Sequence, residues 1–203
     1  MTDSPSDADG VLTHAGDVSE IRQLTLFFAD LVDSTALSTQ VEPETYRLVV
    51  GRYREQVVSI VSAYDGHIGS TKGDGLLAVF GHPSTREDDA RRAVQAGLDI
   101  TREVLRLSDQ SQRRFGFGVN VRVGVHRGLV YVDAAQGDFS GLAANVATGI
   151  SSFAPPGAVV VSDAVETLIR NDFELEACAP AAVKGVKEPV IHYSVVSEQA
   201  PAA

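Results

Sequence analysis

Residues 67–80, HIGSTKGDGLLAVF, constrain the fold most, because two short strand-like runs flank the tight turn KGDG. A glycine-rich turn between two such runs predicts a β-hairpin. The apolar run that follows the turn, residues 76–80, is typical of a buried strand. The hairpin therefore places one carboxylate, that of Asp74, in a tight turn at the beginning of a buried strand.

Two amphipathic helices are predicted on either side of this hairpin, because apolar residues recur there at intervals of three and four. The first helix begins near Pro43, which suits a first helical turn, and ends before the Asp-Gly pair at 65–66. The second follows the segment HPST, residues 82–85. The two apolar stripes consist of Tyr46, Val49, Val50, Tyr53, Val57, Ile60, Val61 and Tyr64, and of Ala90, Ala93, Val94, Gly97, Leu98, Thr101, Val104 and Leu105.

The remaining elements complete an α+β pattern. A strand is predicted within residues 23–31, ending near Asp30, and residues 117–134 are strand-like, with Gly128 marking a turn. A loop at 136–141, a short helix, a strand, a small helix and two closing strands follow. The order β-α-β-β-α-β matches a ferredoxin-like core with a β/α extension. We therefore expect an antiparallel-rich sheet with helices packed on one face.

Length and composition favour one soluble domain. We expect a domain at residues 21–197 and flexible tails at 1–20 and 198–203, which are polar and small in character. The net charge of −10 argues against a nucleic-acid partner. The single Cys178 and five scattered histidines exclude a disulfide framework and a typical structural zinc site. With no targeting signal and no apolar run long enough to span a bilayer, we expect a cytoplasmic protein without a membrane partner.

Two carboxylates are expected to meet at one edge of this sheet. Asp30 ends the first strand and Asp74 lies in the hairpin turn, and neighbouring strands are ~4.8 Å apart. Without a cation the two charges would repel and one group would be driven to protonate. Either residue alone is more simply explained, Asp74 as a turn former and Asp30 as a helix N-cap. Together they favour a site for two Mg²⁺ ions of the kind that catalyses displacement at phosphorus.

Five segments resemble, in order, the conserved blocks of class III adenylate/guanylate cyclase catalytic domains. They are LTLFFADLVDSTALS at 24–38, GDGLLAVFG at 73–81, VRVGVHRGLV at 121–130, GDFSGLAANVA at 137–147 and KGVKEPVIHYSVV at 184–196. The resemblance implies conversion of ATP or GTP to a 3′,5′-cyclic nucleotide and pyrophosphate, with two Mg²⁺ or Mn²⁺ ions. It also implies a head-to-tail homodimer whose two sites are shared between the chains.

The resemblance assigns roles to individual residues. Asp30 and Asp74 correspond to the metal-binding aspartates. Asp138 corresponds to a purine contact, and Asn145 to the catalytic asparagine that orients the ribose. Backbone amides at a helix start would meet the phosphates, and the residues concerned are Leu31, Val32, Ser34 and Thr35.

Two positions depart from the family pattern. Ser70 stands where a purine-reading lysine is usual, and Gly149 stands where an arginine stabilises charge on the phosphate in the transition state. Loss of such a donor commonly lowers the rate by ~10²–10³. We therefore expect weak activity, and an inactive pseudocyclase that binds nucleotide or a partner remains the alternative. A diguanylate-cyclase-like enzyme is disfavoured, because the hairpin lacks a GG[DE]EF-type sequence. We interpret Asp33 as a helix N-cap.

Overall fold

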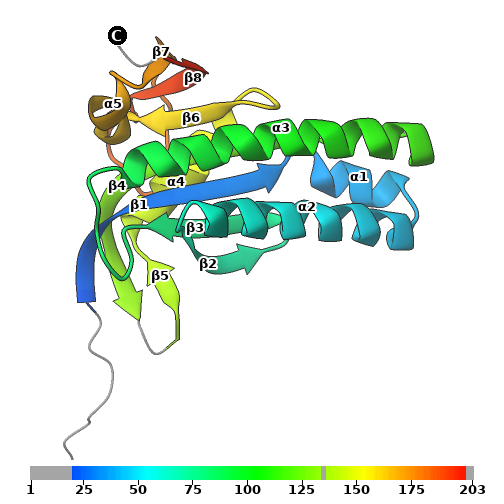
Figure 1. The fold of residues 1–203 in the computed structure, drawn as a ribbon, viewed down its shortest axis with the longest axis horizontal. Coiled ribbons are helices and arrows are strands. Elements are labelled where there is room, and N and C mark those ends of the chain that lie inside the picture. Colours follow the sequence, from blue (N-terminus) through cyan, green and yellow to red (C-terminus); the bar gives the residue numbers. More distant parts are fainter. Residues whose placement is uncertain (1–19, 134–135, 200–203) are drawn as a thin grey trace, which may run out of the picture.

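A computed structural model describes residues 20–133 and 136–199, which form one curved sheet with helices on both faces (Figure 1). The elements are β1 (Glu20–Leu31), α1 (Ser34–Gln40), α2 (Pro43–Ala63), β2 (His67–Lys72), β3 (Gly75–Phe80), α3 (Asp89–Phe115), β4 (Val121–Asp133), β5 (Asp138–Ser140), α4 (Leu142–Phe153), β6 (Val159–Ser162), α5 (Asp163–Ile169), β7 (Phe173–Ala177) and β8 (His192–Glu198).

The strand order confirms the predicted α+β class. The sheet runs β2-β3-β1-β4-β6-β8-β7, and β5 pairs with β4 outside this path. Strand β1 lies between β3 and β4, as a ferredoxin-like core requires, and among the strands of the described residues only β4 and β6 pair in parallel. The β6–α5–β7–β8 segment supplies the predicted extension. The predicted hairpin and both long helices are present, and β5 is a short strand where we expected a loop.

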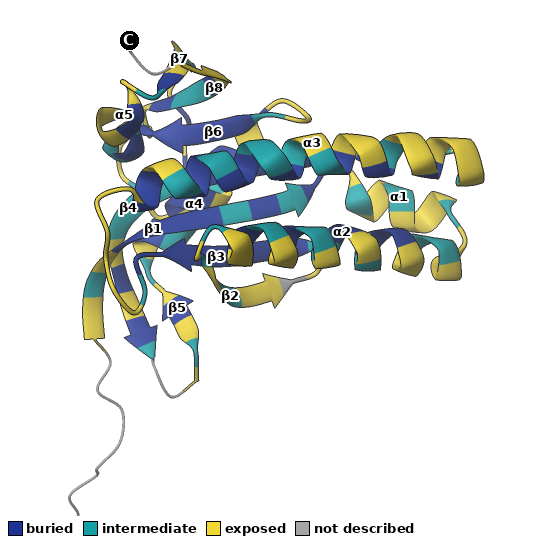
Figure 2. Cartoon of the chain, in the orientation of Figure 1, coloured by how far each residue is buried: buried dark blue, intermediate teal, exposed yellow. Residues whose placement is uncertain are grey.

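The central strand β1 is buried on both faces, and this corrects one expectation. Phe27, Ala29 and Leu31 pack with α2 and α3, whereas Leu24 and Leu26 pack with α4 on the opposite face. The prediction that the helices share one face is therefore wrong for α4. Figure 2 shows the buried surfaces of α2 and α3 turned toward the sheet, with α4 behind it. A continuous apolar strand is typical of a sheet covered on both sides.

Gly128 does not mark a turn, because β4 continues through it from Val121 to Asp133. A Cβ at Gly128 would lie 2.9 Å from the Cβ of Ala143 on α4. A Cβ at Gly124 would lie only 2.3 Å from the carbonyl oxygen of Ala147. The two glycines therefore allow α4 to pack directly on the backbone of β4, a function that the local sequence does not distinguish from a turn.

One residue of a predicted apolar stripe and the two ends of the domain also differ from the sequence prediction. Leu105 was assigned to the apolar stripe of α3 but is 60% exposed, whereas Leu107 is buried. Glu20 belongs to β1 and Glu198 to β8, and the rest of the predicted N-terminal tail lies outside the described residues. Within 20–133 and 136–199, no helix combines the length and apolarity needed to cross a bilayer.

We predict that Gly124→Ala destabilises the domain by about 1–3 kcal/mol, because the added methyl group overlaps the α4 backbone. Gly51→Ala is the matched control, since its Cβ would meet nothing within 4 Å and it lies inside α2. That control should be neutral or stabilise by up to ~1 kcal/mol. Urea unfolding of both variants measures the difference, and equal stabilities would contradict the close α4–β4 packing.

Candidate active site

The hairpin turn and the end of β1 bring Asp30 and Asp74 together. Lys72 pairs with Gly75, so the turn has two residues, and Gly73 takes the left-handed φ of 64° that favours glycine. Ala29 of β1 pairs with Leu76 of β3. One step further along this ladder, Asp30 lies across from the beginning of β3, next to Asp74. The register therefore produces the juxtaposition that the sequence predicted.

The electrostatics of this pair are unfavourable without a cation. The pKa of Asp30 is raised to about 6, chiefly by burial and further by the negative charge of Asp74 and the contact between the two carboxyl groups. The nearby charge of Arg122 opposes the shift only in part. Asp74 Oδ2 is buried and has no hydrogen-bond partner among the described residues. An orphaned carboxylate oxygen beside a second carboxylate fits divalent cations, which prefer oxygen ligands.

The protein supplies only part of a coordination shell there. Across residues 20–133 and 136–199, no group of three or more His, Cys, Asp or Glu side chains converges on one point. Two carboxylates leave several positions of an octahedral Mg²⁺ ion to water or to substrate. Mg²⁺ is usually held in this way, by one or two carboxylates together with the phosphates of the substrate.

A groove of about 570 Å³ opens beside Asp30, and it is lined by a positively charged side chain that the sequence did not connect with the site. Arg122 lines this groove together with Asp30, Ser34 and Thr35. Arg122 pairs with Asp30 across the β1–β4 ladder, and its Nη1 donates to the carbonyl oxygen of Ser152 at 3.1 Å. Its Nε is buried without a partner in the described part of the chain. The pairing of β1 with β4, which no local pattern specifies, brings this guanidinium to the carboxylates.

The predicted phosphate-binding segment is only partly available. The amide of Val32 donates to the carbonyl oxygen of Asn120 at 2.8 Å, and Leu31 is buried. The amides in the first turn of α1 have no acceptor within the helix, and Ser34 and Thr35 of that turn line the groove. Asp33 occupies the N-cap position with φ 54°, but its side chain makes no capping hydrogen bond. The N-cap interpretation of Asp33 is therefore correct in position and wrong in mechanism.

Two tyrosines of α2 also lie near the carboxylate pair. Burial raises the pKa of Tyr53, and the charges of Asp30 and Asp74 raise it further. Its hydroxyl is fully buried and lacks a hydrogen-bond partner among the described residues. Burial likewise raises the pKa of Tyr46, whose hydroxyl contacts Ser34. The sequence placed both tyrosines on the apolar face of a helix, which is correct, but did not connect them with the candidate site.

The other predicted site residues lie elsewhere on the same chain. Asp138 pairs with Asp133 at the far end of β4, whereas Asp30 pairs with Arg122 near the beginning of that strand. Eleven residues separate these two positions on β4, which corresponds to a path of about 35 Å along the strand. That distance exceeds the length of an extended nucleoside triphosphate. One chain therefore does not bring Asp138 and the carboxylate pair onto one nucleotide.

Asn145 and Ser70 are both exposed. Asn145 lies on α4 between Ala143 and Ala147, the residues beside Gly128 and Gly124. Ser70 lies on the edge strand β2, next to an irregularity in its pairing with β3. Neither residue lines the groove beside Asp30. Both remain predictions, and their exposure leaves them open to a ligand or to a second chain.

Gly149 is closely covered by another part of the chain. A Cβ at this position would lie 2.5 Å from Cγ1 and 2.8 Å from Cγ2 of Val183. Val183 belongs to a small apolar cluster that includes Val146 and Ile150 of α4. An arginine at position 149 therefore does not fit unless Val183 moves. Replacing a glycine inside a helix ordinarily favours the helix, but the contact with Val183 opposes an arginine at this position.

Comparison with known proteins identifies the family of this fold and site. The model for the adenylate and guanylate cyclase catalytic domain matches residues 17–197. An adenylate cyclase of Streptomyces coelicolor is 31% identical over 80% of this chain and 39% of its own length. Putative adenylate cyclase 3 of Rhizobium meliloti is 28% identical over 83% of this chain and 27% of its own. The chain thus spans well under half the length of these relatives.

Similar solved structures support the same family. The adenylyl cyclase CyaB from P. aeruginosa has a TM-score of 0.81 and 26% identity, covering 91% of this chain and 99% of its own. The guanylate cyclase domain of RhGC from Catenaria anguillulae, solved in complex with GTP, has a TM-score of 0.76. At 24% identity, with 89% of this chain and all of that chain covered, it shares the fold. The chain therefore belongs to the adenylate and guanylate cyclase catalytic domain family.

Proposed function

We propose that this domain is a nucleotidyl cyclase that converts ATP or GTP to the 3′,5′-cyclic nucleotide and pyrophosphate. The juxtaposition of Asp30 and Asp74 beside the groove lined by Arg122 carries this proposal. Carboxylates suit hard divalent cations, and a guanidinium suits phosphates. A cyclic-nucleotide assay with Mg²⁺ or Mn²⁺, on ATP and on GTP, tests the activity directly.

The proposed chemistry divides between the metal end of the site and the nucleoside end. Asp30 and Asp74 would hold two Mg²⁺ or Mn²⁺ ions. Such ions, when bound, lower the pKa of the ribose 3′-hydroxyl and neutralise phosphate charge. Arg122 and the first-turn amides of α1 bind the phosphates beside them. Since the 3′-oxygen attacks the α-phosphorus of the same molecule, these residues act chiefly by orienting the substrate and stabilising charge.

At the nucleoside end, Asn145 orients the ribose and Asp138 contacts the purine, with Ser70 in place of the usual lysine. The separation along β4 supports a site shared by two chains, in which one chain supplies Asp30 and Asp74 and its partner supplies Asn145 and Asp138. A closed twofold dimer would contain two equivalent sites. This arrangement lets one nucleotide reach residues that a single chain holds apart.

The second candidate function is a pseudocyclase that binds nucleotide without turning it over. The packing of Val183 over Gly149 favours this alternative, because Val183 fills the space that a side chain at position 149 would need. Ser70 also offers a weaker and less selective hydrogen bond to a purine than lysine does. Both candidates require the same carboxylate pair, so they differ in turnover and agree on metal-dependent binding.

We predict that Asp30→Asn or Asp74→Asn abolishes metal-dependent nucleotide binding. Each substitution removes one charge from a pair that holds cations between protein and triphosphate. Calorimetry with Mn²⁺ and a nucleoside triphosphate measures the loss. If both variants bind metal and nucleotide like the wild type, the assignment of these carboxylates is wrong.

Stability measurements provide the folding control for Asp30→Asn. Because the folded-state pKa of Asp30 is raised from 3.8 to about 6, ionised Asp30 destabilises the metal-free protein. This destabilisation of the folded state is absent below pH 4 and develops as the pH rises through about 6. Allowing for partial solvent screening, we expect Asp30→Asn to stabilise the metal-free chain by about 1 kcal/mol at pH 7 and not at pH 4.

We predict that mixing Asp30→Asn chains with Asn145→Ala chains restores activity. Each variant homodimer lacks a functional group in both sites, whereas a mixed dimer contains one site with neither substitution. Turnover per mixed dimer should reach about half that of the wild-type dimer, since one of two equivalent sites is intact. Mixing two differently tagged Asp30→Asn chains is the control and should restore nothing. An active wild type without rescue in the mixture would exclude a shared site.

We predict weak, Mn²⁺-favoured turnover with poor discrimination between ATP and GTP, because Asp138 is left as the main base contact. A single base contact discriminates weakly, because leaving one buried polar group unpaired costs only about 1–3 kcal/mol.

Gly149→Arg alone should destabilise the protein through its clash with Val183. Gly149→Arg combined with Val183→Ala should raise turnover over Val183→Ala alone, with little change in nucleotide affinity. Rapid Mg²⁺-dependent turnover of one nucleotide by the wild type would contradict the prediction.

A further inference from the structure

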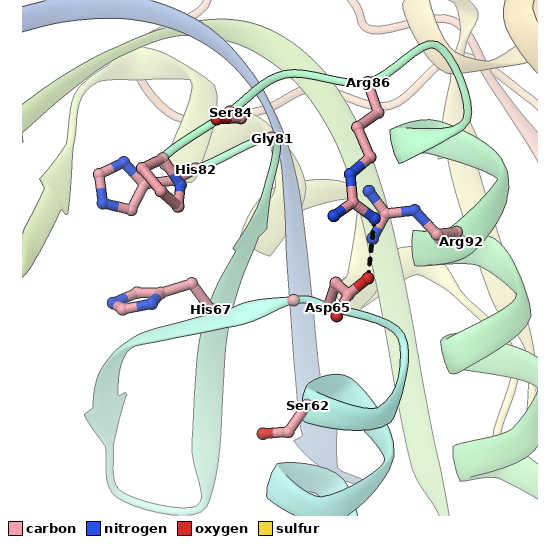
Figure 3. Close-up of a pocket in the computed structure, with 10 residues that line it drawn as sticks. Ser62, Asp65, His67, Gly81, His82, Ser84, Arg86 and Arg92 are labelled. Atoms are coloured by element: carbon pink, nitrogen blue, oxygen red, sulfur yellow. Dashed lines mark hydrogen bonds and ion pairs between the residues drawn. The ribbon is translucent and has the colours of Figure 1, made fainter.

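A second cavity lies at the other end of the β2–β3 hairpin from Asp74. It has a volume of about 390 Å³ and lies between the end of α2, the beginning of β2 and the loop from β3 to α3 (Figure 3). Its polar lining consists of Ser62, Asp65, His67, His82, Ser84, Arg86 and Arg92. None of these residues has a part in the proposed cyclase site, so the chemistry of the cavity is a separate question.

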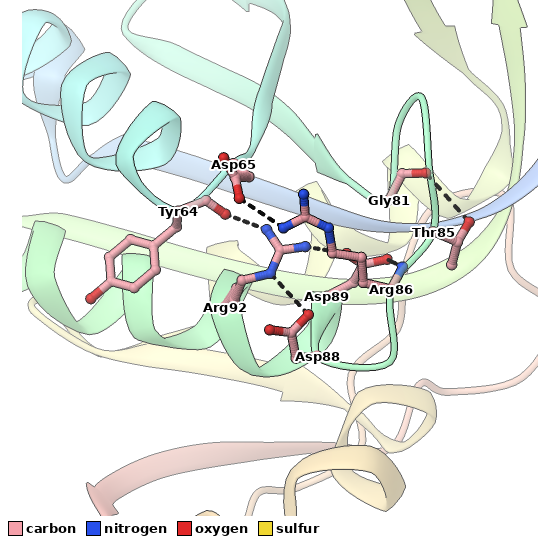
Figure 4. Close-up of polar contacts among 8 residues, drawn as sticks. All are labelled: Tyr64, Asp65, Gly81, Thr85, Arg86, Asp88, Asp89 and Arg92. Carbon is pink, nitrogen blue, oxygen red and sulfur yellow. Dashed lines mark hydrogen bonds and ion pairs between the residues drawn. The ribbon is translucent and has the colours of Figure 1, made fainter.

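The arginines of this cavity are already neutralised by carboxylates (Figure 4). Arg86 Nη1 bonds to Asp65 Oδ2 at 2.8 Å. Arg92 forms ion pairs with Asp88 and with the buried Asp89, and it donates to the carbonyl oxygen of Tyr64. The same contacts occupy the carboxylates. The cavity is therefore a poor site for an anion, and its carboxylates are poor ligands for a hard cation.

The two histidines remain as the groups able to hold a ligand. The ring centroids of His67 and His82 are 5.3 Å apart, with an angle of 69° between the ring planes. Figure 3 shows both rings at the same side of the cavity, His67 from the beginning of β2 and His82 from the loop that follows β3. Imidazole nitrogens bind Zn²⁺ at about 2.0–2.1 Å, so two imidazoles on one tetrahedral ion have centroids roughly 5 Å apart. The observed centroid separation matches this requirement.

Two further observations support a ligand at this pair. The Nδ1 atom of His82 is buried and has no hydrogen-bond partner in the described part of the chain. Such an orphaned nitrogen calls for an ion or a water molecule. Phe139 of β5 packs edge-on against both imidazoles, at centroid distances of 5.6 Å from His67 and 5.3 Å from His82. The phenyl ring therefore braces the two imidazoles in place.

We propose that His67 and His82 form a two-histidine site for a borderline divalent cation such as Zn²⁺. Imidazole nitrogen selects Zn²⁺, Cu²⁺ or Ni²⁺ over Mg²⁺ and Ca²⁺, which prefer oxygen ligands. No third His, Cys, Asp or Glu converges on this pair within residues 20–133 and 136–199, so water completes the coordination. The site is thus open, unlike a closed structural zinc centre, and it is separate from the carboxylate pair that would hold Mg²⁺ or Mn²⁺.

Calorimetric titration of ZnCl₂ into the full Asp30→Asn chain tests the proposal, because that background disables the carboxylate site. We expect one Zn²⁺ per chain. Adding His67→Gln or His82→Gln should weaken binding by roughly tenfold or more. The matched control, Cys178→Ser, removes the one thiol and should leave binding unchanged. Absence of Zn²⁺ binding in the Asp30→Asn chain, or unchanged binding in both histidine variants, overturns the site.

Electron paramagnetic resonance of Cu²⁺ bound to the same background gives a second measurement that does not depend on how the variants fold. Two coordinated imidazoles produce hyperfine coupling to two nitrogen atoms, and we expect that pattern with one Cu²⁺ per chain. Coupling to one imidazole or to none contradicts a shared histidine site. Both measurements are independent of cyclase activity, so an inactive domain would leave the proposal intact.

Discussion

The pairing of β1 with both β3 and β4 is the constraint on which the site depends. It places Asp30 beside Asp74 on one side and Arg122 on the other, and it buries the apolar residues of β1 on both faces of the sheet. Without a cation, the resulting carboxylate pair destabilises the folded chain, and the raised pKa of Asp30 reflects this destabilisation. The packing of two helix layers provides the stability that allows this local conflict to persist.

The length of β4 then explains why one chain is insufficient for the proposed reaction. The carboxylate pair lies near Arg122, and the predicted purine contact lies beside Asp133, about 35 Å further along the strand. The proposed twofold dimer would resolve this separation, because it would pair unlike ends of two identical chains. The glycines of β4 contribute here as well, since Gly124 and Gly128 let α4, which carries Asn145, lie directly against the strand.

Local patterns predicted much of this fold. The apolar stripes identified both long helices, the Gly-Asp-Gly turn identified the hairpin, and the element order gave β1 its central place beside Asp74. Contacts between distant segments were not predictable in this way. The side of the sheet on which α4 packs, the approach of Arg122 to Asp30, and the cover that Val183 places over Gly149 each depend on tertiary packing. Gly128 was misassigned because a turn and a close helix contact require the same residue.

The most direct test of the central claim is anomalous diffraction from crystals of the full chain grown with Mn²⁺ and a non-hydrolysable nucleoside triphosphate. We expect two Mn²⁺ peaks, about 3.5–4 Å apart, each coordinated by the carboxylates of Asp30 and Asp74 and by phosphate oxygens. Bound nucleotide with no Mn²⁺ peak at either carboxylate would contradict that claim.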